Sequence, residues 1–449
     1  MAGSVGPPRV SKSFYGCFGI LLATLCLAGK GSAQIQGSAG QEGTKPFTAT
    51  VAIREGYDSN PLTQSYQLSQ DIRSSTYTTI QPSLGYNYIG LQADAALRYD
   101  FSGTYYPSLN QQYDIQYAQT FVGRYTYAID PRTSFTLANN FVYTEQPLVD
   151  QFTLLGIAPV VQQTSSGISS TINNLATAQA DYRVTDRLSM ITRWNNTLVY
   201  IGGNGSNGNY MNNGAFQQFR LDFTPETVGT FSFDYQIYDY DNDNAFRDNQ
   251  QVSFSIGADH TFLPELFFSG RVGVQLNDNF GLADNANIIG AGGMGSGEQE
   301  IQATPFASIS STWNYEEKSF VSAGFSMQVQ QSNLNTQSDS EAYTLNLNWD
   351  HTFTEKFSII QSFFINVAVF TPQLTAEQTQ NLFPGAVYQG SGQQTTVTYQ
   401  CKFAYQFLPY LSGELGWSYT SFGNYFDLNN GNGGSYTRNQ VYLGVRGTY

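Results

Sequence analysis

Charged side chains recur at alternate positions within segments rich in tyrosine and phenylalanine. Opposite charges that face each other on neighbouring strands form ion pairs, and along a polar wall they discriminate between ions by charge. The basic residues of this set are Arg54, Arg98, Arg124, Arg183, Arg193, Arg220, Arg271 and Lys402. Its acidic residues are Asp94, Asp100, Asp181, Asp222, Asp234, Asp259, Asp350 and Glu414. Because the two groups are equal in size, we predict that they line one wall of no net charge.

The acidic excess of the chain falls in links rich in asparagine and glycine. There are 34 Asp and Glu residues against 20 Lys and Arg. The acids of the links are Asp58, Asp71, Asp150, Asp278, Asp284, Glu298, Asp339, Glu341 and Asp427. One further segment, DYDND (239–243), is similar to the start of a calcium loop, but Asn244 replaces the required glycine and Gln250 the final acid. We therefore expect a solvated acidic loop, with loose Ca²⁺ binding or a Ca²⁺ bridge to lipopolysaccharide as the alternative, and predict no metal-site residues.

The two histidines, His260 and His351, lie in similar segments, ADHTFLPE and WDHTFTEK, each just before a short turn. We expect both on an outward face among aromatic neighbours. The chain has no nucleophile elbow, zinc spacing, phosphate loop or dinucleotide fingerprint. The sequence thus predicts no enzyme and no cofactor, with an outer-membrane hydrolase as the enzymatic alternative.

These residues require extended elements to position them. In 343–350 and 397–406, apolar and polar residues alternate with the period of a β-strand. Short turns such as IDPR (129–132) and FTEK (353–356) alternate with long polar links, a pattern typical of transmembrane β-barrels. We predict an all-β, antiparallel, up-and-down transmembrane barrel of roughly 18 strands, with short periplasmic turns and long extracellular loops. A barrel of about 16 strands remains the alternative, because 46–56 and the segment with Pro305 are the weakest strands.

The N-terminal segment has the features of an export signal. Residues 1–33 combine basic residues, an apolar run and small residues before Gln34, as secretory signal peptides do. We predict a signal peptide at 1–33, a short periplasmic segment at 34–45 and a barrel at 46–449 in the outer membrane of a Gram-negative bacterium. The net charge of −14 argues against nucleic acid as a partner.

The last nine residues, VYLGVRGTY, alternate once more. Val441, Leu443 and Val445 are expected to face lipid, and Tyr449 to lie in a periplasmic belt of aromatic residues. An alternating last strand with a terminal aromatic resembles the signal that the barrel-assembly machinery recognises. We therefore predict Val441, Leu443, Val445 and Tyr449 as an assembly signal.

The segment REGYDSNPL (54–62) resembles the β-barrel porin family of Gram-negative outer membranes. Members carry an aromatic–Asp–x–Asn motif after the first strand, here Tyr57, Asp58, Ser59 and Asn60. The resemblance implies an outer-membrane channel, sometimes near polysaccharide export systems, and supplies no functional residues. Locally, Asp58 and Asn60 are expected to cap a turn and Pro61 to end the first strand.

From these patterns we expect a porin for passive diffusion of small hydrophilic solutes, including saccharides. The acidic loops predict a mild cation preference. The alternative is a plugged structural or surface-interaction barrel associated with exopolysaccharide. Expected partners are outer-membrane lipid, lipopolysaccharide, the barrel-assembly machinery and small hydrophilic solutes, and a homo-oligomer is compatible with the sequence.

Overall fold

The computed structural model describes residues 30–31, 46–63, 74–109, 114–145, 170–202, 209–241, 248–278, 302–331, 339–370, 391–426 and 435–449. These residues form strands and turns, and no helix among them is long and apolar enough to cross a membrane. The predicted signal peptide and the segment 34–45 lie outside the described residues, except for Lys30 and Gly31.

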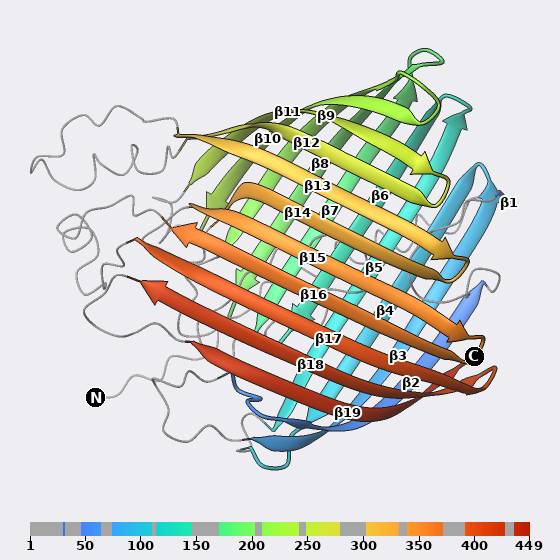
Figure 1. Cartoon of the computed structure of the whole chain (residues 1–449), viewed down its shortest axis with the longest axis vertical. Coiled ribbons are helices and arrows are strands. Elements are labelled where there is room, and N and C mark those ends of the chain that lie inside the picture. The colour runs from blue at the N-terminus through green and yellow to red at the C-terminus, as the bar shows by residue number, and fades with distance from the viewer. Residues whose placement is uncertain are drawn as a thin grey trace, which may run out of the picture.

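The strands run along the whole described chain (Figure 1). Their bounds are β1 Lys30–Gly31, β2 Phe47–Asp58, β3 Ser75–Leu91, β4 Ala93–Tyr105, β5 Ile115–Asp130, β6 Thr133–Thr144, β7 Thr171–Arg183, β8 Leu188–Ile201, β9 Tyr210–Asp222, β10 Thr227–Tyr240, β11 Asn249–Leu263, β12 Leu266–Asp278, β13 Gln302–Glu316, β14 Ser319–Gln331, β15 Asp339–Thr354, β16 Phe357–Phe370, β17 Gly392–Leu408, β18 Leu411–Phe426 and β19 Tyr436–Thr448.

The strands β2–β19 close into one antiparallel ring. Each pairs with the next in sequence, and β19 pairs with β2 in a register that places Gln440 opposite Asp58 and Thr448 opposite Thr50. The two-residue β1 pairs with the end of β3, outside the ring. The prediction of an 18-stranded antiparallel barrel is confirmed, and both weak segments are strands.

Pro305 is tolerated in β13 because the pairing of β13 with β14 begins two residues after it. The ladder between β13 and β14 starts at Ala307 and Met327, so Pro305 lies beyond it. On that side its missing N–H therefore costs no ladder hydrogen bond.

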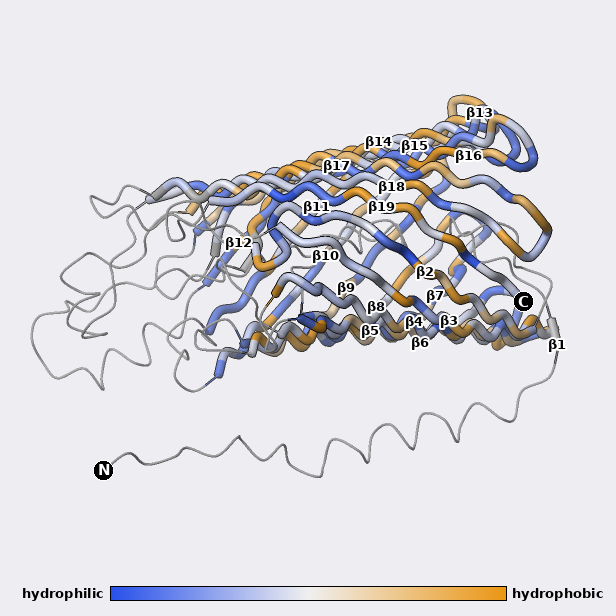
Figure 2. Tube along the Cα trace, turned by 90° about the horizontal axis from the view of Figure 1, so that it is seen from below, coloured by the Kyte–Doolittle hydropathy of each residue, from blue (hydrophilic) through white to orange (hydrophobic). Residues whose placement is uncertain are grey.

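The ring is flattened. In Figures 1 and 2, β13–β18 form one layer and β3–β8 the other, and β10–β12 and the β19–β2 pair lie at the two edges. At one end the strands are joined by short turns, for example at 131–132, 264–265 and 317–318. The connections at the other end include 146–169, 279–301 and 371–390, which lie outside the described residues.

The outer face of the ring is apolar and ends in an aromatic belt. Leu443, Ile256 and Val272 are more than half exposed on its middle. Beside the short turns, Phe223, Phe262 and Tyr410 are exposed to 61–63 %. A closed barrel satisfies its backbone hydrogen bonds within the wall, and an apolar band with an aromatic girdle matches a lipid bilayer. The chain is therefore an outer-membrane β-barrel protein of the Gram-negative type.

Candidate functional site

A buried ion pair joins the first and last strands of the ring. Arg438 Nη2 lies 2.6 Å from Asp58 Oδ2, and Arg438 Nε donates to both oxygens of Asp58 at 2.9 and 3.1 Å. The Asp58 side chain is 0 % exposed and that of Arg438 3 %. Two parallel N–H···O bonds fix the guanidinium plane, so the pair holds β2 and β19 in one register.

Three further groups complete the hydrogen bonding of Asp58. Tyr106 donates its hydroxyl to Asp58 Oδ2 at 3.2 Å, and Gln440 Nε2 donates to the same oxygen at 3.0 Å. The backbone N–H of Asn60 donates to Asp58 Oδ1 at 3.0 Å, which is the predicted turn cap. A buried carboxylate is tolerated only when its lone pairs are filled in this way.

The position of Asp58 corrects one expectation. We expected Asp58 among the solvated acids of the loops, but it belongs to β2 and is buried. Three more of the predicted loop acids also belong to strands: Asp278 to β12, and Asp339 and Glu341 to β15. The others, Asp71, Asp150, Asp284, Glu298 and Asp427, lie outside the described residues. The adjoining Ser59 exchanges hydrogen bonds with Asn439, whose N–H donates to Ser59 Oγ at 2.8 Å. The aromatic–Asp–x–Asn segment therefore forms the corner at which the ring closes, opposite Arg438, a residue that was not predicted from the sequence.

The most deeply buried side chains gather at the strand ends opposite the short turns. The largest of them that are less than 2 % exposed are Tyr106, Gln116, Val199, Asn60, Asn249, Asn277, Asp58 and Pro61. Each lies within three residues of a strand end that leads into a long connection. We call this zone the outer rim. Its inward side chains are covered, whereas many on the rest of the wall stay partly exposed.

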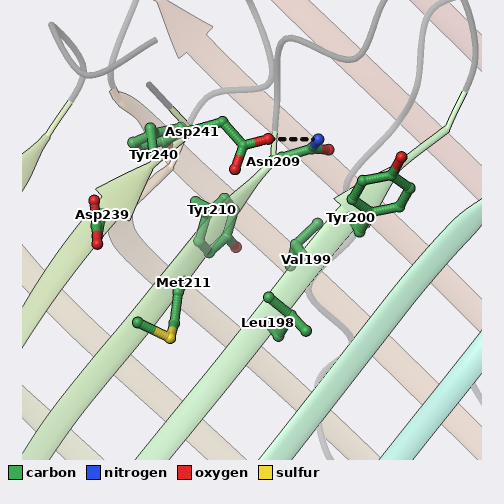
Figure 3. Close-up of a pocket in the computed structure, with 9 residues that line it drawn as sticks. All are labelled: Leu198, Val199, Tyr200, Asn209, Tyr210, Met211, Asp239, Tyr240 and Asp241. Atoms are coloured by element: carbon green, nitrogen blue, oxygen red, sulfur yellow. Dashed lines mark hydrogen bonds between the residues drawn. The ribbon is translucent and has the colours of Figure 1, made fainter. Parts of the chain in front are cut away.

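The outer rim also holds a tyrosine cluster and a small cavity on β8–β10 (Figure 3). Tyr210 lies 5.3 Å from Tyr240 and 5.7 Å from Tyr238 between ring centroids, and all three rings are buried. Asn209 donates to Asp241 Oδ2 at 2.8 Å across the mouth of this cluster. The cavity measures about 260 Å³ and is lined by aliphatic, aromatic and acidic side chains. The expected acidic loop is described only as far as Asp241.

The inner wall carries ion pairs between strands that are adjacent or separated by one strand. Glu414 is contacted by Arg54 at 2.8 Å and by Arg446 at 2.7 Å. In the second group, on β9, β11 and β12, Arg220 and Arg271 lie 3.2 and 3.6 Å from Asp259. Arg446 lies on the same parity of β19 as Tyr442, the parity that the alternation of the last strand predicts to face the lumen or the periplasmic rim.

The remaining candidates have other partners. Arg98 pairs with Asp100 on its own strand at 2.9 Å, and the Arg193 guanidinium lies 4.5 Å above the Phe216 ring. Gln236 donates to Asp234 and Gln179 donates to Asp181. The backbone N–H of Gly90 donates to Asp94 at 3.4 Å, and Arg183 donates to the Asp186 carbonyl at 2.9 Å. Among the described residues, no ion pair within 4 Å joins Arg124, Asp222, Asp350 or Lys402 to an opposite charge. Their role in lining the lumen stays a prediction.

The histidines lie in the aromatic belt near the short turns. His260 shares a hydrogen bond with Thr227 Oγ1 at 2.8 Å, and His351 with the Tyr315 hydroxyl at 2.9 Å. Each imidazole packs edge-on against a phenylalanine at 4.3 Å, Phe262 and Phe353 respectively. Within the described residues, no group of three His, Cys, Asp or Glu could hold a metal ion.

The residues of the expected assembly signal lie on the outer face. Val441, Leu443 and Val445 are 45–67 % exposed, and Tyr449 is 86 % exposed. The Tyr449 backbone N–H donates to the Ala49 carbonyl at 2.8 Å, which extends the β19–β2 pairing to the end of the chain. Recognition by the assembly machinery remains a prediction.

No family model matches the sequence, and no curated protein matches it. Solved structures similar to this chain include the FrpB iron transporter of Neisseria meningitidis (F5-1 variant), with 10 % identity, 90 % of this chain and 82 % of that chain covered, and a TM-score of 0.41. A mutant of the ferric enterobactin receptor PfeA of Pseudomonas aeruginosa has 8 % identity, 91 % and 81 % coverage, and a TM-score of 0.43. The siderophore receptor PirA of Acinetobacter baumannii has 8 % identity, 91 % and 81 % coverage, and a TM-score of 0.42.

The comparisons correct the expected function. The named structures are an iron transporter and siderophore receptors rather than passive porins or enzymes, so the expectation of a passive diffusion porin with mild cation preference is wrong. The physical reason is that strand alternation and turn rhythm specify a large barrel but not what the barrel admits. At this identity and TM-score we transfer no ligand to this chain. The resemblance of Tyr57–Asn60 to a porin family finds no matching family model.

Proposed function

We propose that this chain is a ligand-selective transport protein of the outer membrane, in which solute enters through a covered outer rim. The observation that carries the proposal is the burial of inward polar and aromatic side chains at that rim. Asp58, Tyr106 and Asn249 are each 0 % exposed. The burial of Asp58 is tolerated because its carboxylate is fully paired with Arg438, Tyr106 and Gln440, so these side chains form a packed part of the rim and do not face water.

The rim also supplies the chemistry of recognition. The cavity beside Tyr210 and Tyr240 combines aromatic surface with the hydrogen-bonding groups of Asn209 and Asp241. Binding sites commonly pair an apolar lining with a few placed polar groups. We infer that solute makes specific contacts here before it passes along the charged wall.

Uptake into proteoliposomes tests this proposal. The full chain is reconstituted, and the initial uptake rate is measured against concentration for neutral solutes, anionic solutes and a ferric siderophore, the class of compound named for the similar structures. Selective transport predicts a rate that saturates for one class and is inhibited by unlabelled members of that class. Rates that rise linearly for every solute and depend only on its size would overturn the proposal.

A pair of variants tests whether the selective uptake depends on the outer rim. Tyr240→Ala removes a buried ring of the cluster, and Tyr425→Ala removes an outward ring that is 66 % exposed. We expect Tyr240→Ala to raise the concentration for half-maximal uptake and Tyr425→Ala to leave it unchanged. Equal effects of the two substitutions would speak against recognition at the rim.

A further inference from the structure

Both carboxylate oxygens of Glu414 are occupied by arginines from different strands. Arg54, on β2, donates to Oε2 from Nη2 at 2.8 Å and from Nε at 3.2 Å. Arg446, on β19, lies 2.7 Å from Oε1 through its Nε. The Glu414 side chain is 3 % exposed, whereas that of Arg446 is 31 % exposed. The acid is thus enclosed while a guanidinium stays open to the interior.

A third cation adjoins this group. Lys402, on β17, interacts electrostatically with Glu414, Asp350, Arg54 and Arg446. It makes no ion pair within 4 Å with any described residue, so its three N–H donors remain for another acceptor. Three cations against two carboxylates leave one excess positive charge at this place on the wall.

Two glycines show that the cluster is built around these side chains. A Cβ on Gly444 would lie 2.7 Å from Arg54 Cγ, and one on Gly416 would overlap the Tyr442 ring. The Arg54 guanidinium in turn lies 4.8 Å above that ring. A cation over an aromatic face is held by the ring quadrupole. The glycines therefore leave room for Arg54 and Tyr442 to hold their positions.

The same charge arrangement recurs on the opposite edge of the ring. There Arg220 and Arg271 bracket Asp259, and Arg193 interacts with Asp234 and with Arg271. This group lies on β8–β12, along the upper edge in Figure 1, and the Glu414 group lies on β15, β17, β18, β19 and β2 toward the lower edge. The recurrence of three cations with two acids indicates more than strand cross-linking, for which balanced pairs would suffice.

We propose that Arg54, Lys402 and Arg446 form an anion-binding site around Glu414 on the inner wall. The ligand is a small anion with carboxylate or phosphate oxygens, because guanidinium and ammonium donors match both. Glu414 holds the two arginines in place, and Lys402 donates to the ligand. The site deepens the proposed function, since it names the class of solute that passes along the wall.

Isothermal titration calorimetry on the full chain in neutral detergent at low salt tests the site, with citrate and inorganic phosphate as separate probes. We expect saturable binding of at least one probe that weakens as salt is raised. Lys402→Gln should weaken it roughly tenfold or more, as the loss of a charged hydrogen bond does. The matched control, Arg98→Gln, removes one positive charge elsewhere on the wall and should change the affinity little.

Glu414→Gln separates a binding site from a purely structural cluster. Glutamine keeps a side-chain oxygen that accepts from Arg54 and removes the negative charge that competes with the ligand, so binding of the anion should strengthen. Unchanged or weaker anion binding in this folded variant would overturn the site. If Glu414→Gln does not fold, Lys402→Gln and Arg98→Gln decide alone. The proposal is overturned if wild-type protein binds neither probe, or if Arg98→Gln and Lys402→Gln weaken binding equally. Anion binding together with linear, unsaturable uptake would instead overturn only the proposed transport function.

Discussion

Arg438 Nη2 lies 2.6 Å from Asp58 Oδ2, although the two residues are 380 positions apart in the sequence. The contact forms only when the last strand pairs with the first, so it belongs to the closed barrel and to no open intermediate. Tyr106 and Gln440 donate to the same carboxylate. The pairing of β19 with β2 that closes the barrel therefore contains a buried polar cluster at the outer rim. We call this pairing the seam.

Asp58→Asn should destabilise the closed barrel strongly. Removing one partner of a buried pair leaves an uncompensated charge and costs about 3–5 kcal/mol. The measurement is the urea dependence of unfolding from lipid vesicles, with heat-modifiable migration on gels as a check of assembly. Asp100→Asn is the control: its pair with Arg98 is partly exposed, so its loss should cost about 1 kcal/mol or less. Equal effects would show that the seam pair contributes no special stability.

The sequence was sufficient to predict the faces of the strands, because alternation reports them locally. Leu443 and Val445 are exposed on the outer face, Glu414 is buried in the wall, and the 18-stranded count is confirmed. The partner of Asp58 could not be predicted in the same way. Arg438 stands beside a long link, and only the closure of the ring brings it to β2. Arg438 is two and four residues from Gln440 and Tyr442, so the alternation of the strand places it on the same face as these residues.

The alternation of the strands and the lengths of the turns do not predict which side chains are buried inside the barrel or what the barrel transports. Alternation sorts residues into inward and outward sets, but the burial of Tyr106 depends on its contacts with Asp58, Arg438 and Tyr77 on other strands. The expectation of a passive porin therefore rested on rhythm and on a short motif, Tyr57–Asn60, whose role in the structure is to close the ring.

Leu443→Arg should destabilise the barrel in the membrane. Leu443 is 67 % exposed on the outer face near the middle of β19. An arginine facing lipid at mid-depth costs about 2–4 kcal/mol. Equilibrium folding into vesicles measures the difference, with Leu443→Ala as the control that removes apolar contact without adding charge. A cost for Leu443→Arg no larger than that for Leu443→Ala would mean that this face does not meet lipid.

Replacing Tyr449 with Asp should reduce assembly more than it reduces the stability of assembled protein. The side chain is 86 % exposed, so few intramolecular contacts are lost, and the backbone pairing with Ala49 can persist. The readout is the yield of heat-modifiable barrel in cells, compared with the unfolding of the same variant from vesicles. An unchanged yield in cells would mean that Tyr449 is not part of an assembly signal and that the last strand only closes the barrel.

Gln275 should hold the end of β14 through its side chain. The β13–β14 ladder stops at Ala307 and Met327, and beyond it the Val329 N–H donates to Gln275 Oε1 at 2.9 Å while Gln275 Nε2 donates to the Val329 carbonyl at 3.3 Å. The amide side chain thus makes the two hydrogen bonds that a neighbouring strand would otherwise make. Both are buried, so their loss leaves backbone groups without a partner.

We therefore expect Gln275→Leu to expose the Val329 amide to exchange. Its hydrogen-exchange protection should fall roughly tenfold or more, because a buried hydrogen bond of about 1–3 kcal/mol is removed. Gln81→Leu is the matched control, since Gln81 makes only a long contact of 3.4 Å to Ser102. Protection at Val329 that is equal in wild type and in Gln275→Leu would show that the ladder end is held by the β14–β15 pairing alone. A loss confined to Val329 and its neighbours would instead establish Gln275 as the residue that fixes this part of the outer rim.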